Sequence, residues 1–84
     1  MENKKNNEPT KLEFGVALSF LKRGYRVARQ GWNGKGMFIE AQFPDEKSKM
    51  TLPYIFMKTA CGNNVPWLAS QTDIMEDDWI VCSD

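Results

Sequence analysis

Polar and apolar residues divide the chain into a short polar start and a patterned body. Residues 1–9 carry mainly charged and amide side chains, so we expect a disordered tail, followed by a single domain over residues 10–84. The first pattern in the domain is helical. Apolar residues recur at i, i+3, i+4 and i+7, at Phe14, Ala17, Leu18 and Leu21. This spacing predicts an amphipathic helix over residues 11–23.

Residues at both ends of this segment agree with a helix. Thr10 and Glu13 have the spacing of a capping box, in which side chains satisfy the free backbone groups of the first turn. Lys22 and Arg23 suit the negative C-terminal end of the helix dipole. Gly24 is typical of the residue that directly follows a helix.

The rest of the chain has the short alternating runs of an antiparallel sheet. We expect strands over residues 25–29, 37–43, 54–60 and 79–82, and a short strand over 65–68 that Pro66 interrupts. The sequence therefore predicts an α+β fold, with one N-terminal helix packed on a mainly antiparallel sheet of about four or five strands.

Turn residues separate these runs. Asn33-Gly34, within the segment GWNGKG, is the strongest short sequence signal for a two-residue hairpin turn. Residues 44–49 are a charged loop and residues 61–64 a second turn. Ser70 or Thr72 is expected to cap one helical turn that reaches Asp78.

Charge and length narrow the class of function. The chain has 84 residues, with 11 Lys plus Arg and 11 Asp plus Glu, and therefore no net charge. A binder of DNA or RNA needs an excess of cations, so we expect no nucleic acid polymer as a partner. One or two cations suffice for a small anionic ligand. A chain this short buries a limited core, so association with further copies would stabilise it.

No sequence signal points to a membrane or to secretion. No apolar run approaches the ~18 residues that a membrane span needs. The polar start differs from the apolar segment of a secretory signal. We therefore expect a cytosolic protein in which Cys61 and Cys82 are free thiols.

Catalytic chemistry has little support. The chain has no histidine, which removes the commonest general base and zinc ligand and any Ser–His or Cys–His couple. GWNGKG departs from a Walker loop, because Gly36 follows Lys35 and the next element reads as a strand. Asp77 and Asp78 are adjacent and cannot face one site together in regular structure. We favour binding over catalysis and predict no catalytic residue, cofactor or metal.

The three tryptophans raise different expectations. Trp79 alternates with other apolar residues near the chain end and is expected in the core. Trp67 suits a core and a pocket position equally. Trp32 lies in the glycine-rich turn, where glycines let a ligand approach the backbone and an indole offers a flat face to a base. For Trp32 we favour a pocket over a core position.

Polar residues close to these tryptophans suit other parts of a nucleotide. The tetrad SQTD offers four side chains for ribose hydroxyls and base edges, at Ser70, Gln71, Thr72 and Asp73. The alternative interpretation of this tetrad is a helix cap. Arg29 and Lys58 end strands near the turns, and each is either a phosphate ligand or a solvated cation.

Two long segments resemble the second Thoeris anti-defence family of phage proteins. They are FGVALSFLKRGYRVARQGWNGKGM and PYIFMKTACGNNVPWLASQTDIMEDDWIV. The resemblance covers roughly residues 12–81, and its most specific parts are ARQGWNGKGM and VPWLASQTDIMEDDW.

The resemblance implies a signal-binding function. Proteins of this family are sponges that bind the glycocyclic ADP-ribose signal of the bacterial Thoeris system and hold it uncleaved, so that the effector is not activated. Some members also bind cyclic dinucleotides of a second defence system. Members form homo-oligomers, commonly tetramers, with pockets at subunit interfaces. The resemblance thus implies a non-enzymatic protein in the cytoplasm of the infected host.

The family motifs also imply which residues bind the ligand. Carried over residue by residue, the set is Trp32, Asn33, Ser70, Gln71, Thr72 and Asp73, with Phe14 of the motif FG-x-AL as a further candidate. Adenine would stack on Trp32, the riboses would meet Asn33 and the tetrad, and the diphosphate would meet Arg29 and Lys58. The alternative is a structural or protein–protein interaction module of a phage, with its tryptophans buried at an oligomer interface.

Overall fold

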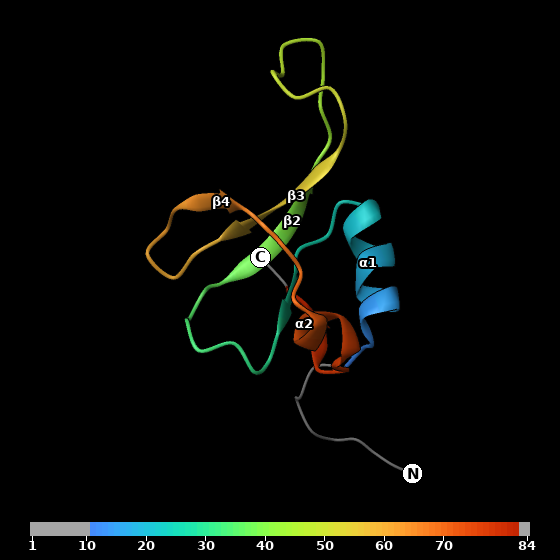
Figure 1. The fold of residues 1–84 in the computed structure, drawn as a ribbon, viewed down its shortest axis with the longest axis vertical. Coiled ribbons are helices and arrows are strands. Elements are labelled where there is room, and N and C mark those ends of the chain that lie inside the picture. Colours follow the sequence, from blue (N-terminus) through green and yellow to red (C-terminus); the bar gives the residue numbers. More distant parts are fainter. Residues whose placement is uncertain (1–10, 83–84) are drawn as a thin grey trace.

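One helix lies against a five-stranded antiparallel sheet in the computed structural model of the protein, which describes residues 11–82 (Figure 1). The predicted α+β fold class is confirmed. The tail predicted over residues 1–9 lies outside the described residues. In chain order the elements are α1 (Phe14–Lys22), β1 (Val27–Arg29), β2 (Phe38–Gln42), β3 (Tyr54–Lys58), β4 (Asn64–Pro66), α2 (Gln71–Met75) and β5 (Trp79–Val81).

The strands are arranged in the order β4-β3-β2-β1-β5. Val27 of β1 is opposite Ile39 of β2 on one side and opposite Val81 of β5 on the other, and Ile39 is in turn opposite Met57 of β3. Residues directly opposite each other in an antiparallel sheet point to the same face. These side chains therefore form the inner face of the sheet, which faces α1. The residues that alternate with them form the outer face.

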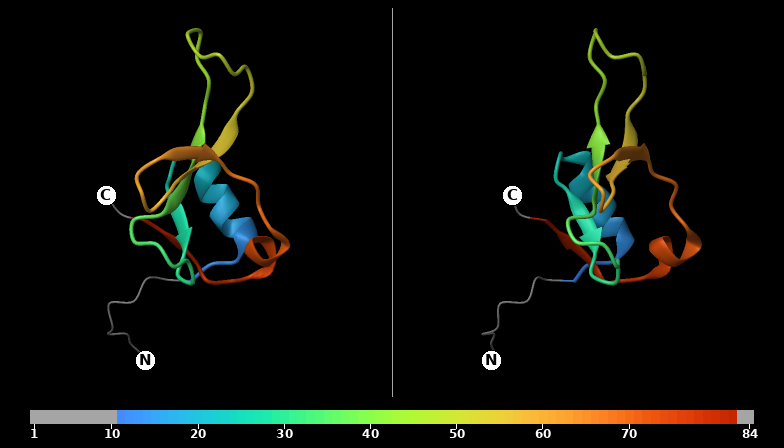
Figure 2. Two further views of the ribbon diagram at one scale, coloured as in Figure 1. Left: turned by 60° about the vertical axis from the view of Figure 1, so that its left-hand side comes forward. Right: turned by 90° about the vertical axis from the view of Figure 1, so that its left-hand side faces the viewer.

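The core lies between α1 and this inner face. Ala17 and Leu21 of α1 are fully buried against Val27, Ile39 and Trp79, which are also fully buried. Figure 2 shows α1 beside the strands, where it contacts β1, β2 and β5. The prediction that Trp79 belongs to the core is confirmed.

α1 begins at Phe14 rather than at residue 11, and its N-cap is Glu13 without a side-chain capping bond. The predicted capping box placed Glu13 inside the first turn of the helix, and this placement is wrong. Its other residue, Thr10, lies outside the described residues. The cause is an interaction with the far end of the chain. Leu12 exchanges two backbone hydrogen bonds with Trp79, of 2.7 and 3.1 Å, and this bridge keeps the chain extended up to the helix start.

The C-terminus of α1 agrees with its sequence. Gly24 has a φ of 94°, and its N–H donates to Leu21 O while the N–H of Tyr25 donates to Phe20 O. These two bonds define a Schellman motif, which a glycine in this position favours. Because Tyr25 belongs to the motif, β1 starts at Val27 rather than at residue 25.

Four strands and α2 end earlier than predicted. β2 runs from Phe38 to Gln42 rather than over residues 37–43. β3 ends at Lys58, β5 ends at Val81 and α2 ends at Met75, well before Asp78. β4 begins at Asn64 and ends at Pro66, the residue that was expected to interrupt it. β4 is an edge strand, where the missing N–H of a proline is tolerated.

The two-residue turn predicted at Asn33-Gly34 does not form. β1 and β2 are antiparallel neighbours, as expected, but residues 30–37 join them; we call this segment the Trp32 loop. A tight turn of the favoured type needs positive φ at both central residues, whereas in this loop the positive φ belongs to Gly36, at 77°. Tertiary packing explains the difference. A Cβ on Gly34 would lie 2.7 Å from Ala60 Cβ, so the loop folds onto the turn between β3 and β4.

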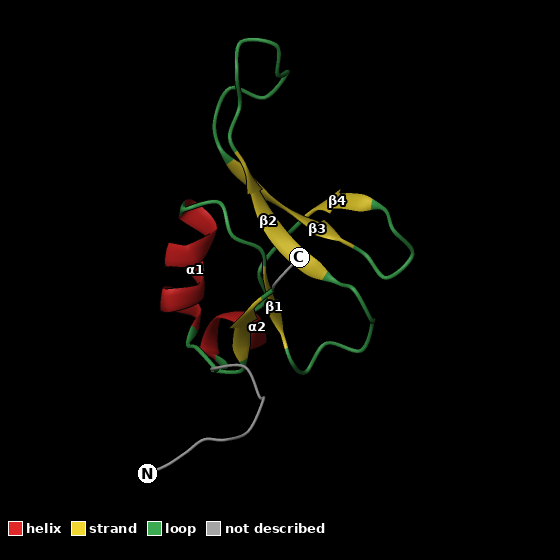
Figure 3. Cartoon of the chain, turned by 180° about the vertical axis from the view of Figure 1, so that it is seen from behind, coloured by secondary structure: helices red, strands yellow, loops and turns green. Residues whose placement is uncertain are grey.

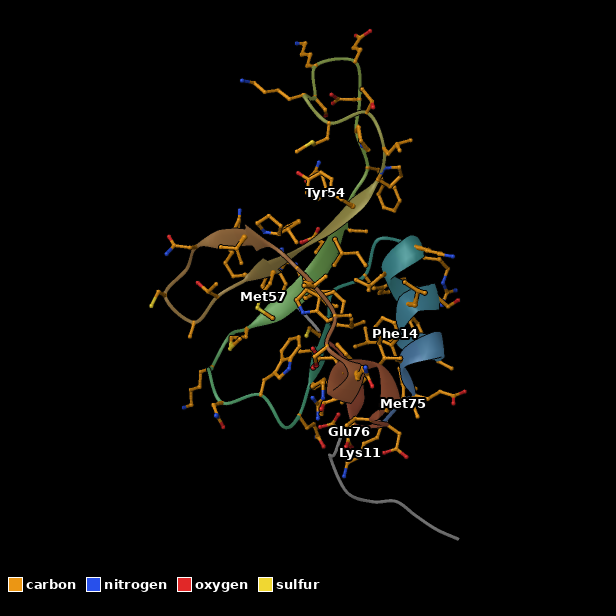
Figure 4. The ribbon with its side chains drawn as sticks, viewed as in Figure 1. Lys11, Phe14, Tyr54, Met57, Met75 and Glu76 are labelled. Carbon is orange, nitrogen blue, oxygen red and sulfur yellow. The ribbon has the colours of Figure 1, made fainter. Side chains whose placement is uncertain are left out.

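The connection between β2 and β3 projects from one end of the sheet (Figures 1 and 3). This arm, residues 43–53, contains the charged loop predicted at residues 44–49, and Tyr54 marks the point where it rejoins the sheet (Figure 4). Large apolar side chains of the arm are exposed, at Phe43, Met50 and Leu52. No helix within residues 11–82 is long and apolar enough to cross a membrane.

Candidate functional site

Aromatic side chains gather around Trp79. The ring centroids of Phe14 and Trp32 lie 5.3 and 5.4 Å from that of Trp79, and the centroid of Trp67 lies 6.1 Å away. Distances of this kind are typical of favourable aromatic pairs. Phe14, at the start of α1 (Figure 4), and Trp67 are half-buried at the margin of the core.

Trp32 combines features of a core position and of a pocket position. Its ring packs edge-on against Trp79 at an interplanar angle of 79°, and it belongs to the half-buried shell around the core. Its backbone N–H donates to Arg29 O at 3.2 Å. The following residue, Asn33, is exposed. One part of the indole is thus held by the core while the loop carries the rest to the surface.

A compact ionic cluster lies beside the start of the Trp32 loop. It consists of Arg29, Asp73 and Asp78. Arg29 Nε donates to Asp78 Oδ1 at 2.8 Å, and Arg29 Nη1 donates to Asp73 Oδ1 at 3.0 Å. The side chain of Arg29 is 13% exposed, that of Asp73 is 14% exposed and that of Asp78 is 22% exposed. One cation meets two anions, so the cluster carries a net negative charge.

All three groups of the cluster favour their charged forms. The hydrogen bond to Asp78 raises the pKa of Arg29. The same bond lowers the pKa of Asp78, against the effect of burial, and the Gly31 N–H lowers it further. Burial raises the pKa of Asp73, but hydrogen bonds from Arg29 and Ser70 outweigh it, and this pKa also lies below its usual value. The cluster is therefore fully ionised at neutral pH.

The tetrad 70–73 forms the helix cap that was considered as the alternative to a binding role. Ser70 Oγ accepts the N–H of Asp73 at 3.0 Å, and Asp73 Oδ2 accepts the N–H of Ser70 at 3.2 Å, which makes a capping box for α2. Trp79 Nε1–H donates to Asp73 O at 2.8 Å. Ser70, Gln71 and Thr72 remain exposed. The cap thus engages both Ser70 and Asp73, and the tetrad residues other than Asp73 are exposed.

Lys58 is apart from the other candidate residues. It is opposite Phe38 and Asn64 in the sheet, and it alternates with Met57, so it belongs to the outer face. Arg29 is opposite Trp79 and belongs to the inner face. The structure therefore brings Phe14, Arg29, Trp32 and the tetrad into one region and leaves Lys58 on the other side of the sheet.

Two ligand-sized hollows border this region. One, of about 490 Å³, lies next to Trp67 and the base of the arm. The other, of about 540 Å³, lies on the outer face next to Ala28 and Phe38, and it is also lined by Arg29 and by residues of the Trp32 loop. Both fall in the range of small-molecule sites. Neither is lined by Trp32 or Asp73, so both hollows leave out the wall that these two residues form.

Sequence reasoning missed the role of Asp78. It treated this residue only as a poor partner of Asp77 in a carboxylate pair. In the structure Asp78 binds Arg29 and also accepts the Gly31 N–H at 2.9 Å. The contact depends on the register that sets Arg29 opposite Trp79, and a local sequence pattern does not contain that information.

Comparison with known proteins places the chain in a family. Residues 12–82 match the family described as Thoeris anti-defense 2-like domain. The chain belongs to this family. It is also 38% identical over 87 residues to a protein described as Thoeris anti-defense 2, from Bacillus phage SP01, in an alignment covering 88% of this chain and 98% of the relative.

The most specific segments shared with the Thoeris anti-defence 2-like family meet in space. ARQGWNGKGM contributes the end of β1 and the Trp32 loop, and VPWLASQTDIMEDDW contributes part of β4, α2 and the start of β5. They are joined by the ion pairs of Arg29 with Asp73 and Asp78, and by the packing of Trp32 on Trp79. The residues that carry the resemblance thus form one structural unit.

Proposed function

We propose that this protein is a phage anti-defence sponge, which acts in the cytoplasm of the infected bacterium. It binds the glycocyclic ADP-ribose signal of the Thoeris system and sequesters it uncleaved, so that the effector is not activated. Membership of the Thoeris anti-defence 2-like family and the name of the phage relative support an anti-defence role. The observation that carries the proposal is the convergence of the two family segments on Trp32 and the tetrad.

The surroundings of Trp32 suit a nucleotide. A half-buried indole, fixed from one side by Trp79, offers a stacking surface with little conformational entropy left to lose. Exposed Asn33 and the exposed tetrad residues Ser70, Gln71 and Thr72 supply hydrogen-bonding groups for ribose hydroxyls. Phe14 extends the aromatic wall from α1. The absence of histidine from the chain fits a protein that holds its ligand without reacting with it.

The diphosphate needs more positive charge than this wall offers. Arg29 already faces two carboxylates, and Lys58 lies on the outer face. We therefore propose that the pocket is completed by a neighbouring copy of the chain in a homo-oligomer, with a tetramer favoured, and that Lys58 serves the pocket of such a neighbour. The exposed apolar side chains of the arm support this arrangement.

The mass of the protein in solution tests this assembly. Light scattering at micromolar concentration is expected to give at least two chains per particle, with four favoured. Leu52, which is 75% exposed on the arm, packs little in the monomer, so Leu52→Asp is expected to lower the mass while leaving the circular dichroism spectrum unchanged. A wild-type mass equal to that of one chain would contradict the proposed assembly.

A depletion-and-release experiment tests sequestration. The protein is mixed with glycocyclic ADP-ribose, the free ligand is removed by filtration, and the retained protein is heat-denatured. A sponge depletes the filtrate and then releases the intact ligand, as shown by mass spectrometry. An enzyme instead yields a product, and a structural or interaction module leaves the ligand in the filtrate; either outcome refutes the proposal. The same assay with cyclic dinucleotides tests the second class of ligand that the family resemblance suggests.

A further inference from the structure

We propose that Asp78 is a positioning residue of the binding site. Its carboxylate fixes the position of the Trp32 loop relative to Arg29 and Asp73. The stacking surface and the tetrad therefore face the same ligand. The ligand-dependent part of this inference rests on the proposed function. The positioning itself is a property of the free protein and is measured separately below.

The first half of the connection runs from Asp78 to the Trp32 loop. Asp78 Oδ2 accepts the Gly31 N–H at 2.9 Å, and the backbone oxygen of Asp78 accepts the Gln30 N–H at 3.0 Å. The next residue, Trp79, packs against the Trp32 ring. Two consecutive residues of the chain therefore fix the start of the loop by two hydrogen bonds and one aromatic contact.

The absence of a side chain at Gly31 makes this approach possible. A Cβ on Gly31 would lie 3.0 Å from Asp78 Oδ2 and 3.5 Å from Arg29 Nη2. The first distance is shorter than ordinary van der Waals contact. The loop backbone thus lies directly against the carboxylate, and a Cβ at position 31 would require the loop or the carboxylate to shift by a few tenths of an ångström.

The second half of the connection runs from Asp78 to the tetrad. Asp78 Oδ1 accepts from Arg29 Nε at 2.8 Å, and the same guanidinium donates to Asp73 Oδ1 at 3.0 Å. Asp73 is the capping-box residue of α2 and accepts the Ser70 N–H. Charge-assisted hydrogen bonds of this kind are stronger and more directional than neutral ones. A displacement of Asp78 is therefore transmitted both to Trp32 and to the tetrad.

Asp78→Asn tests the inference, with Asp77→Asn as a matched control. Both variants remove one negative charge from neighbouring positions. Asp77 is exposed and makes no hydrogen bond or ion pair with the described part of the chain, whereas Asp78 makes the contacts above. An asparagine at position 78 cannot offer two negatively charged oxygens to Arg29 and Gly31 at once, because one of its two terminal atoms is a donor.

The free protein gives the first measurement. In ¹H–¹⁵N spectra, Asp78→Asn is expected to shift the Gly31 amide and the Trp32 indole resonance and to speed amide exchange at Gln30 and Gly31. Asp77→Asn is expected to leave these signals unchanged. If Asp78→Asn leaves the loop signals and exchange rates as in the wild type, Asp78 does not position the loop and the inference is overturned, whatever the ligand does.

Calorimetric titration with glycocyclic ADP-ribose gives the second measurement. The part of the effect that runs through Trp32 cannot exceed the loss of one stacked base, which is about 5- to 150-fold. Within that limit, Asp78→Asn is expected to weaken binding at least about fivefold. In a Trp32→Leu background the same change is expected to weaken binding by a smaller factor, because only the part of the effect that runs through the tetrad remains and the effects of interacting residues are not additive. Equal weakening in both backgrounds would overturn the inference.

A second variant covers the case in which Asp78→Asn fails to fold. Gly31→Ala keeps the charges of Asp78 and Arg29 and crowds the contact between the loop and the carboxylate, because its Cβ would lie 3.0 Å from Asp78 Oδ2. It is expected to shift the Trp32 indole resonance and to weaken binding, as Asp78→Asn does. Unchanged loop signals in this variant would overturn the inference. A wild-type protein that fails to bind the ligand refutes the proposed function, and the spectra of the free variants then decide the positioning role alone.

Discussion

Trp32→Leu is expected to weaken binding of glycocyclic ADP-ribose by about 5- to 150-fold, the effect of losing one stacked base at roughly 1–3 kcal/mol. Leucine retains an apolar contact with Trp79 but has no flat aromatic face. The half-buried Trp32 ring packs edge-on against Trp79, so truncation to alanine would also remove packing and confuse stability with affinity. Calorimetric titration measures the affinity, and circular dichroism verifies that the variant is folded.

Trp32→Phe is the matched control for this prediction. Phenylalanine keeps a flat ring and is expected to retain most of the affinity that leucine loses. A variant series in which leucine and phenylalanine weaken binding equally would show that the volume of Trp32, rather than its aromatic face, matters. If Trp32→Leu binds the ligand as the wild type does, Trp32 does not stack on it.

Trp79→Ala is expected to have the largest effect on stability, about 3–5 kcal/mol. The side chain is fully buried, contacts three other aromatic rings and donates a hydrogen bond to Asp73 O. Small domains have a total free energy of unfolding of only about 5–15 kcal/mol. The change therefore removes a large part of the stability and is expected to leave a substantially unfolded chain at 37 °C.

Urea denaturation followed by circular dichroism measures this effect. Met75→Ala is the control, because Met75 is 80% exposed at the end of α2, and its loss is expected to change the free energy of unfolding by less than about 0.5 kcal/mol. A loss below about 1 kcal/mol for Trp79→Ala would contradict the placement of this residue at the centre of the core.

Hydrophobic periodicity, together with a capping signal for α2, was enough to predict the elements of the fold. The i, i+3, i+4 spacing located α1, and short alternating runs located the strands, because an amphipathic helix and a half-buried strand each bury one face of a fixed period. Gly24 marked the C-terminus of α1 correctly, since its positive φ of 94° is a local backbone requirement. Signals of this kind act within a few residues.

The errors come from contacts between distant parts of the chain. Leu12 is held extended by Trp79, which delays the start of α1. Asn33-Gly34 is a strong local turn signal, yet the packing of Gly34 against Ala60 overrides it. Neither contact is contained in the sequence pattern around these residues.

The candidate site was predictable only in part, because some of its contacts also join distant parts of the chain. Trp32, Phe14 and the tetrad were identified from local patterns and family motifs, and the structure brings them into one region. The pairing of Arg29 with Asp73 and Asp78 and the placement of Lys58 on the outer face depend on strand register. Register also explains why Asp78 was not recognised as the residue that connects the two family segments.

A crystal structure of the protein with glycocyclic ADP-ribose tests the central claim most directly. We predict an intact cyclic ligand with its adenine against Trp32, its riboses near the exposed residues of the tetrad, and a second chain completing the pocket around its diphosphate. A linear or cleaved product in the density would contradict sequestration. An intact ligand bound away from Trp32 would contradict the proposed site.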